Sequence, residues 1–203
     1  TIIDYGVGNL SSIKNMLHRI GVRASITNSK EEIELAEKLI LPGVGHFNYG
    51  MEQLHKSRFV ELLNQRVLID KVPILGICLG VQLLTKGSEE GDASGLGWID
   101  GKTIAFDKSK IGEQRKIPHM GWSYVNSFSQ SKLFTNMPDE ARFYFVHSYH
   151  LQLNNPTDVL VRVNYGYDFT AGVEHENILG VQFHPEKSHK FGMKLLENYI
   201  NLY

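Results

Sequence analysis

The sequence predicts an α/β fold: a single open, mostly parallel sheet with flanking helices and antiparallel additions. In residues 1–86, short apolar segments alternate with segments whose apolar residues recur at helical spacing. The most apolar short segment, VPILGICLG at 72–80, is typical of a strand that a parallel sheet buries on both faces. After residue 87, apolar segments follow one another with turn residues between them, which predicts the antiparallel part.

In the first half, each expected strand is followed by an expected helix. The segment TIIDYG is predicted to be a core strand, and the spacing of Leu10, Ile13 and Leu17 predicts a helix over 10–20 that ends at Gly21. The remaining expected elements are a strand at 22–27, a helix at 30–38, a strand and loop at 39–45, helical residues at 48–70 with a break near 56–57, a strand within 72–80, and a helix at 79–86.

The second half is expected to add antiparallel strands to the central sheet and to end in a helix. Gly and Asp cluster at 87–101, and the final helix, about 188–201, has Phe191, Leu195 and Ile200 on one side. We find no repeat and no linker, so residues 1–203 are expected to form one domain. The expected strands are 102–107, 122–128, 142–153, 159–165 and a pair within 170–185.

Composition excludes several classes of function. Hydrophobic residues make up 42% and charged residues 21%, which is typical of an ordinary globular protein. The formal net charge of −1 predicts no binding to nucleic acid or to an anionic membrane. We expect no membrane span and no leader segment. A single cysteine favours a reducing compartment, so a cytoplasmic location is expected. Nine dispersed histidines predict no metal site, and no cofactor is expected.

The only cysteine, Cys78, lies in the segment GICLG between an apolar strand and a helix. A nucleophile at such a strand-to-helix turn needs very small residues two positions before and after it, and Gly76 and Gly80 occupy those positions. The alternative, a buried cysteine that serves as a small hydrophobic residue, is the commoner role for a lone cysteine.

A base and a carboxylate for this thiol are present in GVQFHPEKS. His184 and Glu186 are two residues apart, and on an extended chain they would face the same side, with Pro185 keeping the segment stiff and extended. A thiol needs a base, and an imidazole needs a carboxylate to set its tautomer. Because parallel strands end at one edge, we predict that Cys78, His184 and Glu186 meet there as a triad. The alternative is a turn with a surface glutamate.

A third segment, LPGVGHF, offers donors for a developing oxyanion. Gly43 and Gly45 let the backbone approach a substrate closely and tolerate a flipped peptide. Acyl transfer needs N–H donors at the tetrahedral oxygen, and we expect these from Leu79 and Val44. An ordinary turn at the end of a strand is the alternative.

Taken together, PGVGHF, GICLGVQLL, SEEG, PHMGW, YFVHSYH and GVQFHPEKS resemble the class I (triad-type) glutamine amidotransferases. Within that class they most resemble the glutaminase subunits of imidazole glycerol phosphate synthase, the HisH family, over essentially the whole chain. The resemblance implies hydrolysis of L-glutamine to glutamate and ammonia through a thioester on Cys78. It also implies that Gln82 and Glu90 bind the two ends of glutamine, assisted by the backbone at Ser148 and Tyr149. The choice of Glu90 over Glu89 depends only on the spacing from Cys78.

Ammonia must reach its acceptor through a dry passage, because in neutral water it is protonated. No part of the chain remains for an acceptor domain, so the acceptor site is expected on another chain. The resemblance implies a heterodimer with a HisF-like barrel cyclase that forms imidazole glycerol phosphate and AICAR in histidine biosynthesis. It places Asn9, Met120, Trp122 and Tyr144 at the interface, where aromatic residues and Met are enriched. Core packing is the alternative for each.

Two departures from the family leave other readings open. Ser123 stands where Asn is often found and His150 where Arg is common, both near the expected docking side. A paralogue that delivers ammonia to another synthase, for sugar amination or amidination, is therefore the main alternative. A catalytically silent binding module is disfavoured by the intact triad residues. A different cysteine hydrolase acting on γ-glutamyl chains or small aldehydes would not need PHMGW.

Overall fold

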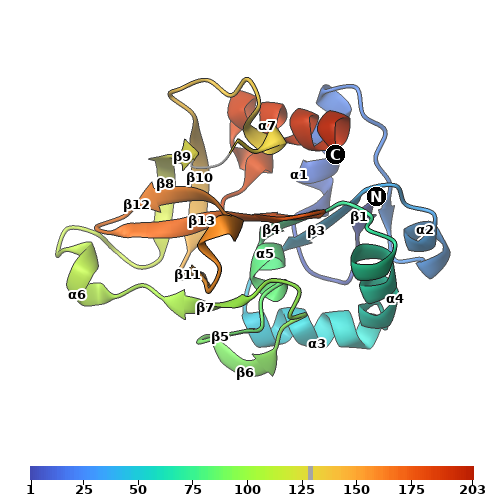
Figure 1. The fold of residues 1–203 in the computed structure, drawn as a ribbon, viewed down its shortest axis with the longest axis horizontal. Helices are drawn as coiled ribbons and strands as arrows, with labels where there is room; N and C mark the ends of the chain where they lie inside the picture. Colours follow the sequence, from blue (N-terminus) through green and yellow to red (C-terminus); the bar gives the residue numbers. More distant parts are fainter. Residues whose placement is uncertain (128–129) are drawn as a thin grey trace.

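The chain folds around a central sheet that lies between two layers of helices (Figure 1). The computed structural model describes residues 1–127 and 130–203. Helices α1 (Leu10–Arg19) and α7 (His189–Leu202) cover one face of the sheet, and α3 (Phe47–Ser57), α4 (Val60–Asn64) and α5 (Leu79–Leu83) cover the other. This arrangement confirms the predicted α/β class.

Each face of the sheet has its own hydrophobic core. Neighbouring strand residues alternate between the two, so that Ile2 and Ile40 pack in one core while Ile3 and Leu41 pack in the other. A strand buried on both faces has no polar side, because every residue meets a helical layer. This explains the continuous apolar segments of the first half.

The sheet has a parallel part and an antiparallel part. The parallel strands, in spatial order, are β2 (Ile26–Thr27), β1 (Ile2–Ile3), β3 (Leu39–Gly43), β4 (Ile74–Cys78) and β14 (Ile178–Val181). The sheet continues through β13 (Asp168–His175), β11 (Tyr149–Leu153), β7 (Gly101–Ala105), β5 (Gly87–Ser88) and β6 (Gly91–Ser94), while β12 (Val159–Asn164) pairs with β13 and with β9 (Asn126–Ser127).

The helices of the first half follow the sequence pattern closely. Gly21, with φ 81°, directly follows the last turn of α1 as expected. The expected helix at 48–70 consists of α3, α4 and a π-helical segment (Gln65–Ile69), with its break at Arg58, which has φ 59°. The acidic helix α2 (Lys30–Glu34) is shorter than the expected 30–38.

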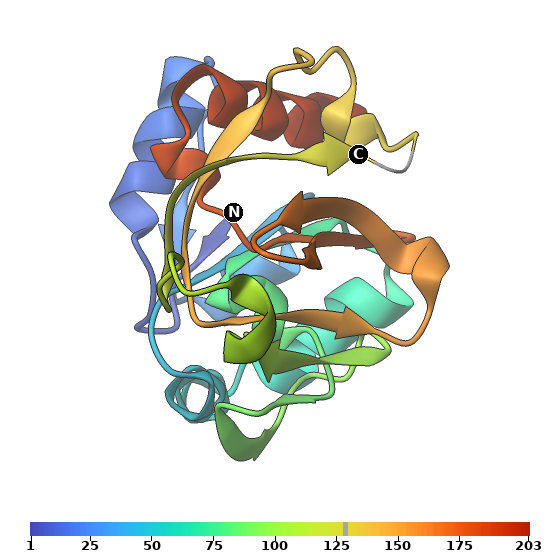
Figure 2. The ribbon, with the colours of Figure 1, turned by 90° about the vertical axis from the view of Figure 1, so that its left-hand side faces the viewer.

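The second half corrects two expectations. Strand β14 pairs in parallel with β4 at the centre of the sheet, and is not an antiparallel addition. Strands β8 (His119–Tyr124) and β10 (Arg142–His147) form a separate antiparallel ribbon, whose two strands run side by side in Figure 2. The expected strand at 122–128 includes Phe128, which lies outside the described residues. Sequence patterns also missed the short helix α6 (Lys108–Ile111) and strands β5 and β6.

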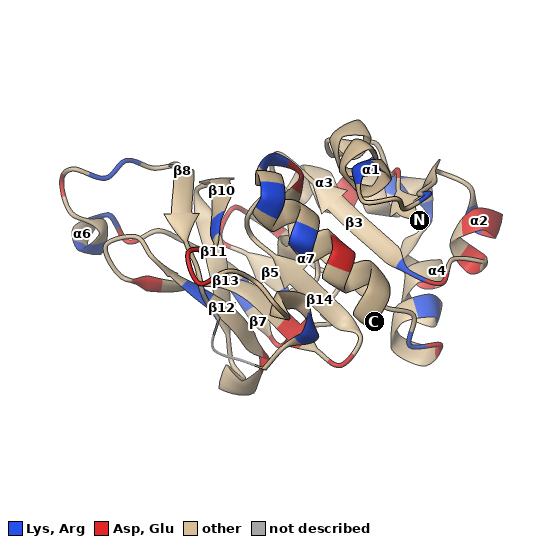
Figure 3. Cartoon of the chain, turned by 90° about the horizontal axis from the view of Figure 1, so that it is seen from above, with Lys and Arg blue, Asp and Glu red and all other residues tan. Residues whose placement is uncertain are grey.

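Charges of both signs are interspersed over the molecule (Figure 3). The acidic α2 and the basic α6 lie at opposite ends, and α7 carries both signs. Within the described part of the chain, no helix has both the length and the apolar character needed to cross a membrane.

Candidate functional site

Three neighbouring parallel strands bring the predicted catalytic side chains to one edge of the sheet. Gly43, the last residue of β3, lies opposite Cys78, the last residue of β4. On the other side of β4, Val181 of β14 lies opposite Ile77, and the chain runs on from there to His184. The C-terminal ends of β3, β4 and β14 therefore meet, as the strand order requires.

Cys78 sits at a sharp turn between β4 and α5. Its backbone has φ 55° and ψ −110°, a conformation that L-residues rarely adopt. A Cβ added at Gly80 would overlap the carbonyl oxygen of Leu41, and one added at Gly76 would lie 2.8 Å from the backbone nitrogen of Val81. Glycine at both positions is therefore a steric requirement of this turn, as the sequence spacing predicted.

His184 and Glu186 form a buried hydrogen-bonded pair. Nδ1 of His184 donates to Oε1 of Glu186 at 2.7 Å, and the two side chains are 1% and 2% exposed. Among the described residues, neither Nε2 of His184 nor Oε2 of Glu186 has a hydrogen-bond partner. Burial alone would lower the pKa of His184, but the neighbouring Cys78 sulfur and the hydrogen-bonded Glu186 carboxylate outweigh it, so that the pKa is raised.

The local backbone of this pair differs from the expected extended segment. Pro185–Lys187 is one turn of 3-10 helix, and the backbone N–H of Lys187 donates to the His184 carbonyl. Proline has no N–H to lose at the first position of a helical turn, so Pro185 suits this position. The turn folds the Glu186 carboxylate back onto the imidazole.

A cavity of about 460 Å³ opens in front of the Cys78 sulfur. Of the residues predicted for the site, Val44, Gly45, Cys78, Leu79, Gln82, Glu90, Ser148, Tyr149 and His184 line it. Two predicted residues lie behind the wall instead. Gly43 packs so closely against Leu79 and the Tyr5 hydroxyl that a Cβ there would lie 2.8 Å from each, and Glu186 lies behind the ring of His184.

The two glutamates of SEEG have different surroundings. The Glu90 carboxylate lines the cavity and accepts a hydrogen bond from the backbone N–H of Phe47 at 2.8 Å. The Glu89 carboxylate lies on the surface, where it faces Lys102 at 3.8 Å. Only Glu90 can therefore contact a molecule bound beside Cys78.

Sequence reasoning missed five residues of the cavity region. Pro118, Val146, His147 and Lys187 also line the cavity, and Nε2 of Gln182 lies 3.8 Å from the Cys78 sulfur. Gln182 had a readable signal, because it lies two residues before His184 on the strand predicted within 170–185, where both side chains would face the same side.

The predicted partner-contact residues are at least partly exposed. Met120 and Trp122 are 61% and 41% exposed on the outer face of the ribbon, and Tyr144 lies opposite Trp122. Asn9 is exposed at the start of α1. The Trp122 ring stacks on His189, with 5.5 Å between ring centres. Met120, Trp122 and Tyr144 thus form an aromatic strip, and Val146, which lies opposite Met120 in the ribbon, lines the cavity.

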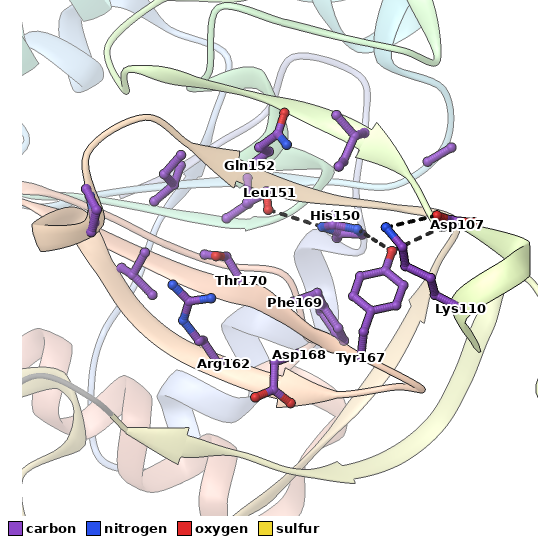
Figure 4. A pocket seen from close by; sticks show the side chains of 15 residues that line it. Asp107, Lys110, His150, Leu151, Gln152, Arg162, Tyr167, Asp168, Phe169 and Thr170 are labelled. Carbon is purple, nitrogen blue, oxygen red and sulfur yellow. Dashed lines mark hydrogen bonds and ion pairs between the residues drawn. The ribbon is translucent and has the colours of Figure 1, made fainter. Parts of the chain in front are cut away.

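Ser123 and His150, the two residues that differ from the family pattern, do not lie on that strip. Ser123 points inward, and its hydroxyl lies 2.9 Å from Nε2 of His119. His150 is buried in the wall of a second cavity of about 410 Å³, where the Tyr167 hydroxyl donates to its Nε2 at 2.8 Å (Figure 4). Figure 4 also shows Lys110, Arg162 and Asp168 around this cavity, which does not include Cys78.

Residues 1–127 and 130–203 contain no group of three or more histidine, cysteine or carboxylate side chains that could hold a metal ion.

The fold and site define a protein of the amidotransferase class. The family model for class I glutamine amidotransferases matches residues 1–202, so the chain belongs to this family. Within it, the chain is similar to the imidazole glycerol phosphate synthase subunit HisH 2 of Methanococcus maripaludis, with 53% identity over 98% of this chain and 97% of that protein. It is 49% identical to the subunit HisH 2 of Pseudomonas aeruginosa, over 99% of this chain and 98% of that one.

Solved structures with much lower identity share the fold. A glutamine amidotransferase crystal structure superimposes with a TM-score of 0.76 at 18% identity, covering 99% of this chain and 97% of that one. The PurLQS structure from Thermotoga maritima gives a TM-score of 0.74 at 20% identity, covering 98% and 96%.

Proposed function

We propose that this chain is the glutaminase subunit of an imidazole glycerol phosphate synthase, with Cys78, His184 and Glu186 as its catalytic triad. The buried His184–Glu186 pair carries this proposal, because it leaves Nε2 of the imidazole without a partner in the described structure, in the cavity that also holds the Cys78 sulfur. The family match supports the choice of glutamine as substrate, and the names of relatives matched over nearly their full length support the choice of synthase.

In the proposed reaction, the Cys78 sulfur attacks the side-chain amide carbon of glutamine. His184 takes up the thiol proton and passes it to the leaving ammonia, while Glu186 holds the ring in the tautomer that leaves Nε2 free. Water then attacks the γ-glutamyl thioester with His184 as base, which releases glutamate and restores the thiol. The raised pKa of His184 fits its role as the proton carrier.

The cavity wall supplies the remaining groups. The backbone N–H groups of Leu79 and Val44 would stabilise the oxyanion, with Gly43 and Gly45 giving the strand end the freedom to present them; Gly45 has φ 100°. Glu90 suits the α-ammonium group of glutamine because a carboxylate is its natural partner. Gln82 and the backbone at Ser148 and Tyr149 would complete the binding of the α-carboxylate and α-amino ends.

The ammonia would pass through a dry channel to a HisF-like barrel cyclase in a heterodimer, with Asn9, Met120, Trp122 and Tyr144 in the contact. The exposed aromatic strip supports this, because aromatic residues and Met are enriched in the centres of interfaces. This chain would then be the hydrolase of a complex whose cyclase part acts as a lyase in histidine biosynthesis. A reduced Cys78 suits a cytoplasmic location.

The experiment measures glutamate release from glutamine by the chain with and without the cyclase of its own genome. The wild type should release glutamate, and faster with the loaded cyclase. Cys78→Ala should abolish release while the complex still forms, because the methyl group leaves the fold intact. Release that survives Cys78→Ala would refute the triad.

The main alternative, delivery of ammonia to another synthase, uses the same triad and stays a prediction. Neither Ser123 nor His150 lies on the aromatic strip, so neither favours it. The two functions separate when candidate partners are compared, because only the true acceptor subunit should raise the rate of glutamate release.

A further inference from the structure

On the inner face of strand β8, behind the aromatic strip, polar side chains form a hydrogen-bonded row. His119 and Ser123 point inward, and exposed residues alternate with them. His119 lies opposite His147 of β10 in the ribbon register. Its ring is held between the rings of Phe145 and Tyr165, at centre distances of 4.8 and 4.0 Å, so it has one orientation.

The hydrogen bonds of this row run in one direction. Nδ1 of His147 lies 2.8 Å from the Tyr149 carbonyl oxygen, which can only accept, so Nδ1 carries the proton. Burial lowers the pKa of His147 and brings that of His119 to about 4, so each ring is neutral and has a single N–H. Nε2 of His147 therefore accepts from Nδ1 of His119 at 3.0 Å, and Nε2 of His119 accepts from the Ser123 hydroxyl at 2.9 Å.

The row continues into the cavity. The Tyr149 carbonyl oxygen also accepts from Nε2 of Gln82 at 3.3 Å, and Nε2 donates its second hydrogen to Oε1 of Gln182 at 3.0 Å. Gln182 in turn directs its Nε2 at the Cys78 sulfur, 3.8 Å away. Both hydrogens of the Gln82 amide are used, so the group that Gln82 offers to the cavity is its oxygen, which makes no hydrogen bond in the described part of the chain.

We infer that His119 and His147 are positioning residues that orient the Gln82 amide, so that its oxygen accepts a hydrogen bond from a donor group of the bound substrate. This inference rests on the proposed glutaminase function. Without His147, the Tyr149 carbonyl loses its shorter hydrogen bond and is free to move away from the Gln82 amide, which then keeps only its hydrogen bond to Gln182. The row starts on β8, and the outer face of β8 carries Met120 and Trp122 of the aromatic strip. If the partner docks on that strip and shifts β8, the shift therefore passes along the hydrogen bonds to the glutamine cavity.

The test measures kcat and KM for glutamine in the complex with the cyclase. His147→Phe removes both hydrogen bonds of the ring, and KM should rise about 3- to 10-fold, the effect of losing one or two neutral hydrogen bonds. His147→Asn, whose amide nitrogen can occupy the position of Nδ1, should recover most of the wild-type KM.

His150→Phe is the matched control. His150 is 4% exposed and His147 is 6% exposed, and each makes two hydrogen bonds, but those of His150 go to Leu151 and Tyr167 beside the second cavity. Both variants should lose thermal stability, whereas only His147→Phe should raise KM. An equal change in KM for the two variants, or no change in either, would overturn the inference.

Two further measurements keep the inference open to refutation. If His147→Phe does not fold, His119→Phe should still raise KM about 2- to 3-fold, because it removes one link and leaves the His147–Tyr149 bond. Nitrogen NMR of the wild-type complex should show the Nδ1–H tautomer on both rings; the Nε2–H tautomer on either would contradict the row. If the wild-type complex releases no glutamate, the proposed function fails, whereas a normal wild type with an unchanged His147→Phe defeats only this inference.

Discussion

His184 and Glu186 are two residues apart, yet their side chains meet at 2.7 Å because a single helical turn at Pro185 folds the chain between them. The carboxylate accepts from Nδ1, and this bond determines which nitrogen of the ring faces the thiol. The pair therefore acts as one unit.

Glu186→Gln should lower kcat about 100- to 10,000-fold with little change in KM. The amide can donate to Nδ1 and so stabilise the wrong tautomer, in which Nε2 carries the proton and cannot accept one from the thiol. Steady-state glutamate release checks this. Glu176→Gln, at an exposed carboxylate paired with Lys71, is the control and should keep wild-type rates. A loss below about 10-fold in Glu186→Gln would show that the carboxylate is dispensable.

Trp122→Ala should weaken binding of the partner about 10- to 100-fold, because large aromatic side chains at the centre of an interface contribute most of its affinity. Titration calorimetry with the cyclase checks this. Leu35→Ala is the control: Leu35 is 83% exposed and follows α2, which lies at the opposite end of the molecule from β8 (Figure 1). Equal affinities for the two variants would place the docking surface elsewhere.

Gly80→Ala should lower the free energy of unfolding by at least about 3 kcal/mol, because its Cβ would overlap a backbone carbonyl oxygen that cannot move without disturbing β3. Chemical denaturation checks this. Gly87→Ala offers a comparison: the nearest atom to its Cβ would be the Ala93 carbonyl oxygen at 3.7 Å, an ordinary contact, so the change should stay within about 1 kcal/mol. Similar losses at both positions would mean that the turn is not sterically demanding.

The protein should lose stability as the pH falls from 6.5 towards 4. Burial lowers the pKa of His119 from 6.5 to about 4, so below pH 6.5 the unfolded chain binds a proton that the folded chain does not. The stabilisation that comes from keeping His119 neutral is fully present above pH 6.5. About 3 kcal/mol of the free energy of unfolding is lost by pH 4. His119→Phe should make the dependence of the free energy of unfolding on pH less steep, with a part remaining because burial also lowers the pKa of His147. Leu35→Ala, at an exposed residue without a titrating group, should leave the slope unchanged. An unaltered slope in His119→Phe would refute this assignment.

Local signals predicted the first half of the fold well. The helical spacing up to Leu17 and the stop at Gly21 are set by neighbouring residues, and so are the glycines on either side of Cys78. These features follow from sterics and periodicity within one segment, which a sequence displays directly.

Features that depend on distant segments were not predicted. Strand β14 has the apolar pattern of any buried strand, and nothing in it indicates that its neighbour is β4, a hundred residues earlier in the chain. The inward direction of His147 depends on the pairing of β10 with β8, which an alternating pattern does not specify. Lys187 reaches the cavity only because the turn after His184 is helical.

In the ribbon of β8 and β10, substitutions that alter partner binding are separated from substitutions that alter the catalytic site. Its outward side chains, such as Met120 and Trp122, stand on strands that contribute neither the sulfur nor the imidazole. In a descendant gene, substitutions at these outward positions can therefore change which partner protein binds. The inward residues of the same strand, such as His119 and Ser123, keep their contacts. Alternation along one short strand thus lets recognition diverge while the chemistry stays the same.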